Sequence, residues 1–283
     1  MNKLTDCYTL KNGVKIPCIG FGTWQTPDGE TAVNAVKTAI ECGYRHIDGA
    51  AVYANESSVG EGIKASGIAR DEIFVTSKVW NDARGYDKTL AACDKSLKDF
   101  GLDYFDLYLI HWPANAINAD NWDDINMDTW RAMIKLYEDG KARSIGVSNF
   151  LPHHLASLMN ARVAPMVNQI ECHPGFMQGD TIDYCVRNNI LVEAWSPMGS
   201  GAMFSNDVVR RIAGKYSKSV AHICIRWNLQ HGILPLPKSV TPSRIKDNTN
   251  VFDFEISPED MSVLDSMPQC GYSGNNPDTF NVI

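Results

Sequence analysis

The sequence predicts a closed (β/α)8 barrel, an α/β fold of the TIM-barrel type, with an N-terminal β-hairpin. Short apolar runs alternate with amphipathic segments along the chain, and this alternation is typical of parallel β/α units. Eight such units occur within 283 residues, a length that suits one closed barrel. Because no linker or low-complexity segment interrupts the pattern, we expect residues 1–283 to form a single domain.

The expected strands are short apolar or β-branched runs, most of them followed by a polar loop. The hairpin comes first, within residues 8–17, where Asn12-Gly13 is a turn signal between two extended runs. The barrel strands are expected at residues 18–21, 44–47, 73–77, 106–110, 144–147, 166–170, 191–194 and 233–237.

Amphipathic helices are expected between the strands, because apolar residues recur there at spacings of three and four. Val33, Val36 and Ile40 mark the first helix face, and Gly43 is well placed to end that helix. The other apolar helix faces are Leu90, Cys93, Leu97 and Phe100; Trp130, Met133 and Tyr137; and Val220, Ile223 and Trp227.

Composition narrows the range of partners. A net charge of −7 argues against nucleic acid or an anionic membrane as the main partner. The first ten residues lack the apolar run of a signal peptide, and no stretch approaches the roughly 18 apolar residues of a membrane helix. The eight cysteines are scattered without a CxxC motif, as in reduced cytoplasmic proteins. We expect a cytoplasmic protein, a monomer or weak dimer, that acts on a small molecule.

Several common motifs are missing. A dinucleotide-binding open sheet needs GxGxxG after a strand, but Gln25 stands where the third glycine would follow Gly20 and Gly22. The sequence has neither GxxxxGK[ST] nor HExxH, so it supports no P-loop and no zinc-protease site. The prediction includes no metal.

Ionisable residues lie at or just beyond the ends of three consecutive expected strands. Asp48 ends the second, with Tyr53 in the loop beyond it, Lys78 ends the third and His111 the fourth. The chemistry of β/α barrels takes place at this end of the strands. Because such groups are costly to bury unless they are paired, we expect them to pair with one another.

These residue types suit the reduction of a carbonyl group. Hydride addition to C=O leaves an oxyanion that needs a proton, and Tyr53 can supply it. A free phenol has a pKa of about 10, which the ammonium group of Lys78 is expected to lower. Asp48 would keep Lys78 charged, and His111 would orient the substrate oxygen.

Each of these residues alone also has a structural interpretation. A tyrosine in a loop is usually structural, and a lysine after a strand is usually solvated. A histidine there is more often a core residue than a catalyst, and an aspartate can simply cap a helix. Their occurrence together on consecutive strand ends favours the catalytic interpretation.

An anion site is expected after the eighth strand, where barrels often bind phosphate. Thr241-Pro242 resembles a helix start, and Lys238, Ser239 and Arg244 add two positive charges and a hydroxyl. A solvated run of charge is the alternative. For a dinucleotide, the bound group would be the 2′-phosphate that distinguishes NADPH from NADH.

Two further features suit a cofactor and a substrate. The small residues of 196–201 would let a pyrophosphate approach the backbone closely. Trp24, Trp80 and Trp112 each follow an expected strand and could wall an apolar pocket, with core packing as the alternative.

Seven segments together resemble the aldo-keto reductase family, in the order and spacing of that family. The likeness runs from about residue 10 to the C-terminus and is closest to shorter microbial members similar to diketogluconate reductases. The segments are GYRHIDGAAVYANE, VTSKVW, LYLIHWP, IGVSNF, VNQIECHP, WSPMGSG and LPKSVTPSRIKDN.

The resemblance implies a catalytic tetrad of Asp48, Tyr53, Lys78 and His111, with Tyr53 as general acid and NADPH as cofactor. It also implies that Asn149 and Gln169 bind the nicotinamide carboxamide, that Trp195 stacks on the ring, and that Trp24, Trp80 and Trp112 line the substrate pocket. The expected cofactor-binding residues are Ser148, Asn149, Gln169, Trp195, Ser196, Met198, Gly199, Ser200, Lys238, Ser239, Val240, Arg244 and, near the adenine, Asn248.

The chain departs from the family pattern in three places. Gly49 replaces the commoner Ser, Thr or Cys, and we expect it to loosen the turn beside Asp48. Trp195 replaces the commoner Tyr, which keeps the stacking face but removes the hydroxyl. The C-terminal segment, residues 271–283, is short, so we expect a more open pocket.

The sequence therefore predicts an NADPH-dependent reductase of aldehydes and ketones. One alternative is a cofactor-binding structural or regulatory barrel without significant turnover. Another is an isomerase or lyase that uses Lys78 as a Schiff-base nucleophile, which the nearby Asp48 would oppose by keeping the lysine charged.

Overall fold

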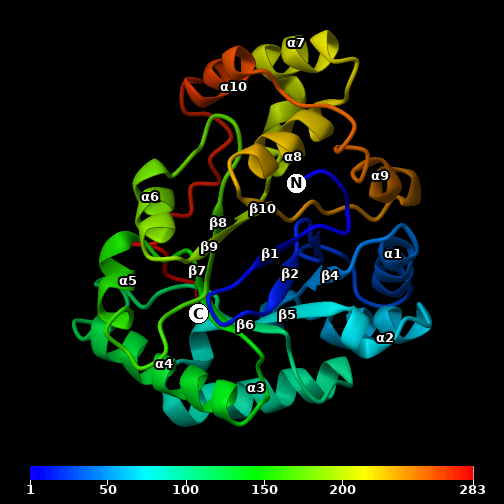
Figure 1. Ribbon diagram of the computed structural model, residues 1–283. Coiled ribbons are helices and arrows are strands. Elements are labelled where there is room, and N and C mark those ends of the chain that lie inside the picture. The colour runs from blue at the N-terminus through cyan, green and yellow to red at the C-terminus, as the bar shows by residue number, and fades with distance from the viewer. Residues whose placement is uncertain (283) are drawn as a thin grey trace.

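The structure, a computed structural model that describes residues 1–282, is a parallel eight-stranded sheet ringed by helices (Figure 1). The strand order runs from β10 stepwise to β3 without a crossover. The first and last strands meet, because Gly20 and Gly22 donate backbone hydrogen bonds to the carbonyl oxygens of Pro235 and Pro237 at 3.1 and 3.0 Å. The predicted fold class is confirmed.

The barrel strands are shorter at the junction than the sequence predicts. Pro235 and Pro237 have no backbone N–H, so they accept hydrogen bonds from the first strand but donate none to it. Only short strands therefore form at this junction. The strands are β3 (Phe21–Gly22), β4 (His46–Asp48), β5 (Phe74–Val79), β6 (Leu107–Ile110), β7 (Ile145–Ser148), β8 (Val167–Glu171), β9 (Leu191–Trp195) and β10 (Leu234–Pro235).

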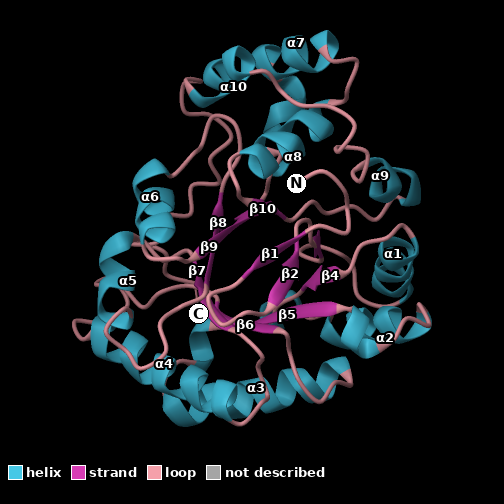
Figure 2. Ribbon diagram, viewed as in Figure 1, coloured by secondary structure: helices cyan, strands magenta, loops and turns pink. Residues whose placement is uncertain are grey.

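The helices form the outer layer, as Figure 2 shows. The helices are α1 (Glu30–Glu41), α2 (Glu56–Ala65), α3 (Tyr86–Phe100), α4 (Trp122–Glu138), α5 (Pro152–Leu158), α6 (Gly179–Arg187), α7 (Asp207–Lys215), α8 (Val220–Gln230), α9 (Pro242–Asp247) and α10 (Pro258–Asp265). Short 3-10 turns are η1 (Ala51–Tyr53), η2 (Arg70–Glu72), η3 (Asn81–Ala83) and η4 (Gly199–Ser205).

The apolar helix faces pack on the sheet as expected. Trp130 of α4 and Trp227 of α8 are fully buried, and each indole N–H donates a hydrogen bond, to Val163 O at 2.8 Å and to Asp265 Oδ1 at 2.7 Å. Burying an apolar side chain of this kind stabilises the fold by about 1.5–3 kcal/mol. Gly101 ends α3 in the left-handed conformation at φ 67°, which a glycine adopts without strain.

The predicted hairpin is present as β1 (Cys7–Thr9) and β2 (Lys15–Pro17), and it lies across one end of the barrel (Figure 1). Asn12 donates a hydrogen bond to the carbonyl oxygen of Arg143, just before β7. Tyr8 donates one to Ile233 O, just before β10. The hairpin therefore covers the N-terminal ends of the strands and leaves their C-terminal ends free for a site.

Two other expectations concern the whole chain. None of the helices in the described part of the chain combines the length and the apolar character that a bilayer crossing requires. The eight cysteines all lie within the described residues and are free thiols, most of them buried.

Candidate active site

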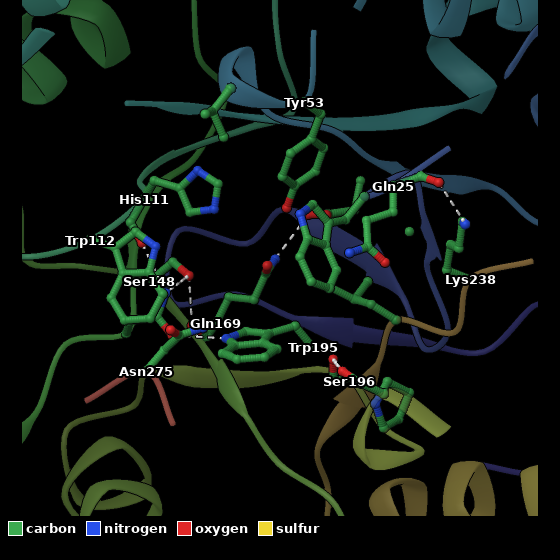
Figure 3. A pocket seen from close by; sticks show the side chains of 18 of the residues that line it. Gln25, Tyr53, His111, Trp112, Ser148, Gln169, Trp195, Ser196, Lys238 and Asn275 are labelled. Atoms are coloured by element: carbon green, nitrogen blue, oxygen red, sulfur yellow. Dashed lines mark hydrogen bonds between the residues drawn. The ribbon is translucent and has the colours of Figure 1, made fainter. Parts of the chain in front are cut away.

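A cavity of about 520 Å³ opens at the C-terminal ends of the barrel strands (Figure 3). Most of the residues singled out from the sequence meet there. The expected site residues among its lining are Trp24, Asp48, Tyr53, Trp80, His111, Trp112, Ser148, Asn149, Gln169, Trp195, Ser196, Met198, Ser200 and Lys238.

A buried ion pair lies beneath the floor of this cavity. Asp48 ends β4 and Lys78 lies on the adjacent strand β5, so the sheet itself brings them together. Lys78 Nζ donates to Asp48 Oδ2 at 2.7 Å, to Asp48 Oδ1 at 2.9 Å and to Gly49 O at 2.9 Å, which uses its three hydrogens. Burial opposes the charge on Lys78, but Asp48 and Tyr53 outweigh it and raise the pKa of the ammonium. This charged lysine does not suit a Schiff-base nucleophile.

Gly49 does not loosen the turn, contrary to expectation. Its N–H donates to Thr76 O at 2.9 Å, and its carbonyl accepts from Lys78, so both backbone groups are held. A Cβ at position 49 would come within 2.9 Å of Phe100 Cζ. Packing against Phe100 explains why glycine suits this position.

Tyr53 ends the 3-10 turn η1 and faces the cavity, partly exposed. Lys78 Nζ lies 5.2 Å from the centroid of its ring. Burial raises the pKa of Tyr53 above its ordinary value, and the Lys78 ammonium only partly offsets this rise. Lys78 thus acts in the expected direction by lowering the pKa of the phenol, but desolvation of the phenolate is the larger effect, so the net shift is upward.

His111 follows β6, and its ring lies edge-on to those of Tyr53 and Trp80, with centroids 5.7 and 5.0 Å apart. Burial, together with the nearby Lys78 ammonium, holds the pKa of His111 well below its usual range. The imidazole is therefore neutral and carries one N–H. Its Nδ1 has no hydrogen-bond partner among residues 1–282.

Asn149 holds one wall of the cavity, in a left-handed backbone conformation at φ 65°. Its Nδ2 donates to His111 O and to Ser148 Oγ, both at 3.0 Å. The indole N–H of Trp195 donates to Asn149 Oδ1 at 2.8 Å. The tryptophan that replaces the commoner tyrosine is thus tied to Asn149 and presents its ring to the cavity.

Gln169 lies on β8, and its amide nitrogen bridges two carboxyl groups. Nε2 donates to Asp48 Oδ1 at 2.9 Å and to Glu193 Oε2 at 2.8 Å. Glu193, fully buried on β9, was not identified from the sequence. The signal was present, since a glutamate interrupts an otherwise apolar expected strand at residues 191–194.

The loop after β9 supplies small residues to another side of the cavity. Ser196 and Ser200 have positive φ, and their hydroxyl oxygens lie 3.0 Å apart. Met198 lines the cavity between them. Gly199 instead packs against His173, where a Cβ would come within 3.2 Å of the ring.

The expected anion site lies farther out. α9 begins at Pro242 after Thr241, as the sequence predicts, and Ser239 Oγ accepts the Thr241 N–H at 3.1 Å. Lys238 lines the cavity and donates to Gln25 O at 3.0 Å. Val240 and Arg244 are exposed beyond the cavity, and Asn248 is buried at the end of α9.

The three tryptophans line the cavity, and so does part of the short C-terminal tail. This tail returns over the cavity, and Phe280 stacks on Trp112. Asn115 Nδ2 holds this tail by donating to Pro277 O at 2.7 Å and to Phe280 O at 3.2 Å. The cavity residues that the sequence interpretation missed include Val52, Phe204, Asn275, Phe280 and Val282.

A closed β/α barrel with ionisable groups around a cavity at its C-terminal end has the arrangement of a barrel enzyme. The chain matches the model of the aldo/keto reductase family over residues 18–268, so it belongs to that family, as the sequence motifs indicated.

Related proteins agree with this assignment. The chain is 50% identical to a glyoxal reductase of Bacillus subtilis (strain 168), over 97% of each chain. It superposes with a TM-score of 0.91 on MGS-M4, an aldo-keto reductase from a deep-sea metagenome library, at 45% identity over 98% of this chain and 100% of the other. A Bombyx mori aldo-keto reductase solved in complex with NADP gives a TM-score of 0.86 at 36% identity, covering 98% and 97%.

Proposed function

We propose that this protein is an NADPH-dependent reductase of aldehydes and ketones in which Tyr53 protonates the substrate oxygen. The observation that carries the proposal is the buried Lys78–Asp48 pair beneath a phenol that faces the cavity beside a neutral imidazole. The similarity to a glyoxal reductase and to an NADP-bound reductase supports both the reaction class and the cofactor.

Tyr53 is the proton donor in this proposal. Its raised pKa keeps the phenol protonated at neutral pH, so the proton is available when the substrate binds. Loss of that proton leaves a phenolate, which the Lys78 ammonium stabilises at close range. Asp48 holds Lys78 in place, and solvent restores the proton to Tyr53 after product leaves.

We assign the orientation of the substrate to His111. A neutral imidazole donates one hydrogen bond without competing with Tyr53 for the proton. Donation to the carbonyl oxygen places that oxygen beside the phenol and stabilises the charge that develops on it.

The side chains of the cavity wall fit a nicotinamide. Trp195 presents a flat ring, and Gln169 Oε1 accepts no hydrogen bond from the described residues although Gln169 lines the cavity. These two, with Ser148 and Asn149, would hold the ring and its carboxamide. When bound, the cofactor supplies the hydride that reaches the carbonyl carbon. The loop containing Ser196, Met198, Gly199 and Ser200 would border the pyrophosphate.

The positive charges at the edge of the cavity and beyond it fit the 2′-phosphate of NADPH. Arg244 and Lys238 supply the charge and Ser239 a hydroxyl, with Val240 between them and Asn248 toward the adenine. The first turn of α9 contains no acidic residue that would repel a phosphate.

We propose uncharged carbonyl compounds as substrates. The walls are apolar and aromatic, from Trp24, Trp80, Trp112 and Phe280. Lys238 is the only lysine or arginine among the described cavity-lining residues, and it belongs to the proposed phosphate end. A substrate carboxylate would find no cation near Tyr53, because Lys78 is already fully paired.

The test follows NADPH absorbance with a panel of aldehydes, comparing the wild-type protein with Tyr53→Phe. The variant should bind NADPH within about threefold of wild type but lose about 10²–10⁴-fold in turnover, the usual range for general acid catalysis. Tyr137→Phe, on α4 and outside the cavity lining, should behave as wild type. Unchanged turnover in Tyr53→Phe would reject the role of Tyr53. A wild-type protein that binds NADPH but reduces no carbonyl would favour a structural or regulatory barrel.

A further inference from the structure

Glu193 is a buried acid that the proposed reaction does not use. It is fully buried within β9 and does not line the cavity. Its Oε2 accepts from Gln169 Nε2 at 2.8 Å, and its Oε1 has no partner among the described residues. Burying a carboxyl group with one unpaired oxygen costs folding free energy, so we expect this side chain to serve a function.

That role concerns the amide of Gln169. An amide nitrogen has two hydrogens, and both are engaged, one by Asp48 on β4 and one by Glu193 on β9. The reverse orientation would aim the amide oxygen at the Asp48 carboxylate, which can only accept, and would lose that bond. The amide is therefore fixed with Oε1 as its free acceptor, and Figure 3 shows the Gln169 side chain between Trp195 and Tyr53.

The side-chain amide of Asn149 is oriented in the same way, with its nitrogen bound to the protein. Both hydrogens of its Nδ2 are directed to His111 O and Ser148 Oγ, which leaves Oδ1 toward Trp195. The two amides that face the cofactor site thus direct oxygens to it rather than N–H groups: Gln169 Oε1 is free, and Asn149 Oδ1 keeps one lone pair beside its bond from Trp195. A ligand group that donates hydrogen bonds suits this pair, and the amide nitrogen of a nicotinamide carboxamide is such a donor.

We propose that Glu193 is a positioning residue: by binding one Gln169 hydrogen, it keeps the Gln169 carbonyl oxygen aimed at the carboxamide N–H of the cofactor. The inference rests on the proposed function, since it requires a nicotinamide in the cavity.

The protonation state of Glu193 agrees with this role. Burial, with the nearby charge of Asp48, raises the pKa of Glu193 to about 8 despite the Gln169 hydrogen bond and the Lys78 ammonium. The carboxyl is then mostly neutral at pH 7, so Asp48 remains the one negative charge that Lys78 balances. A neutral carboxyl still accepts the Gln169 hydrogen through Oε2.

The test measures binding of NADP⁺ and of its 3-acetylpyridine analogue, in which a methyl group replaces the carboxamide NH₂. Tryptophan fluorescence gives both dissociation constants without turnover. Wild-type protein should prefer NADP⁺ by about tenfold, the value of one good hydrogen bond. Glu193→Met should lower that preference to about threefold or less, mainly by weakening the binding of NADP⁺. Glu193→Gln should keep the preference, because its side-chain oxygen can still accept the hydrogen bond from Gln169 Nε2.

Glu56→Met is the matched control. Glu56 is also a buried carboxyl with one close partner, Ser77 Oγ at 2.6 Å, but it lies on α2 away from the cavity lining. This variant should lose stability and keep the preference for NADP⁺. It separates a general effect of removing a buried acid from an effect on Gln169.

Two outcomes overturn this proposal alone. An undiminished preference for NADP⁺ in Glu193→Met would show that Asp48 alone orients Gln169. An equal loss of affinity for both ligands would show a merely structural role. Either result leaves the proposed reductase intact, because wild-type binding and turnover are measured separately. A wild-type protein that binds neither ligand would overturn this inference and the proposed function together.

Discussion

Phe280 stacks on Trp112, with ring centroids 3.8 Å apart and planes 13° from parallel. The two rings come from distant parts of the sequence, one just after β6 and the other near the C-terminus. Through this contact the short tail becomes a wall of the cavity, and it gives the pocket a flat apolar face suited to an aromatic or alkyl substituent.

Removing that wall should affect large substrates selectively. Phe280→Ala should raise KM for phenylglyoxal about tenfold and change KM for methylglyoxal by less than about threefold, because the lost aromatic pair is worth about 0.5–1.5 kcal/mol beyond its buried area. Steady-state kinetics on the two aldehydes checks this. Equal increases for both would mean that the tail supports the site without contacting the substrate.

The Lys78–Asp48 pair should matter for stability as well as turnover. Lys78→Met leaves the Asp48 carboxylate buried and unpaired, and we expect a loss of about 3–5 kcal/mol in the free energy of unfolding. The double variant Lys78→Met/Asp48→Asn no longer carries the unpaired carboxylate charge. It should recover part of that stability but stay inactive. Urea unfolding followed by circular dichroism measures both effects. A double variant no more stable than Lys78→Met would contradict the electrostatic explanation.

Glu193 should make stability depend on pH. Its pKa is about 8 in the folded protein, against an ordinary value of 4.5, so the folded state holds an extra proton between these values. The unfolding free energy should therefore fall as pH rises through that window, with a slope of at most about 1.4 kcal/mol per pH unit, and level off above it.

The comparison with Glu193→Gln isolates this contribution, because glutamine cannot titrate. Thermal unfolding at pH values from 5 to 9 should show the wild type losing stability relative to the variant up to about pH 8. Parallel profiles for the two proteins would mean that the carboxyl of Glu193 is ionised in the fold already at low pH.

Arg244 should govern the choice between the two nicotinamide cofactors. Arg244→Ala should raise the dissociation constant for NADPH about tenfold and leave that for NADH nearly unchanged, since only NADPH carries the 2′-phosphate. Arg187→Ala, an exposed arginine at the end of α6, removes the same charge from a position near the other end of the barrel and should change neither constant. A similar loss for both cofactors in Arg244→Ala would reject the phosphate assignment.

Much of this protein was predictable from local patterns. The alternation of apolar runs and amphipathic segments defined the barrel, and the order of residues at strand ends placed Asp48, Lys78 and His111 around one mouth. The prediction succeeds because the parallel strands of a closed barrel all end on the same side. A residue that follows any strand in the sequence therefore lies at the same mouth of the barrel.

Long-range contacts and solvation were decided only by the tertiary structure. The return of Phe280 onto Trp112 depends on the path of the tail, which no local spacing encodes. The partnership of Glu193 with Gln169 depends on which side chains of β8 and β9 meet. The pKa of Tyr53 depends on how far the surrounding fold desolvates this partly exposed phenol, an effect larger than the attraction of Lys78. Sequence thus determined which groups reach the barrel mouth, and packing determined how they pair and which of them carry charge.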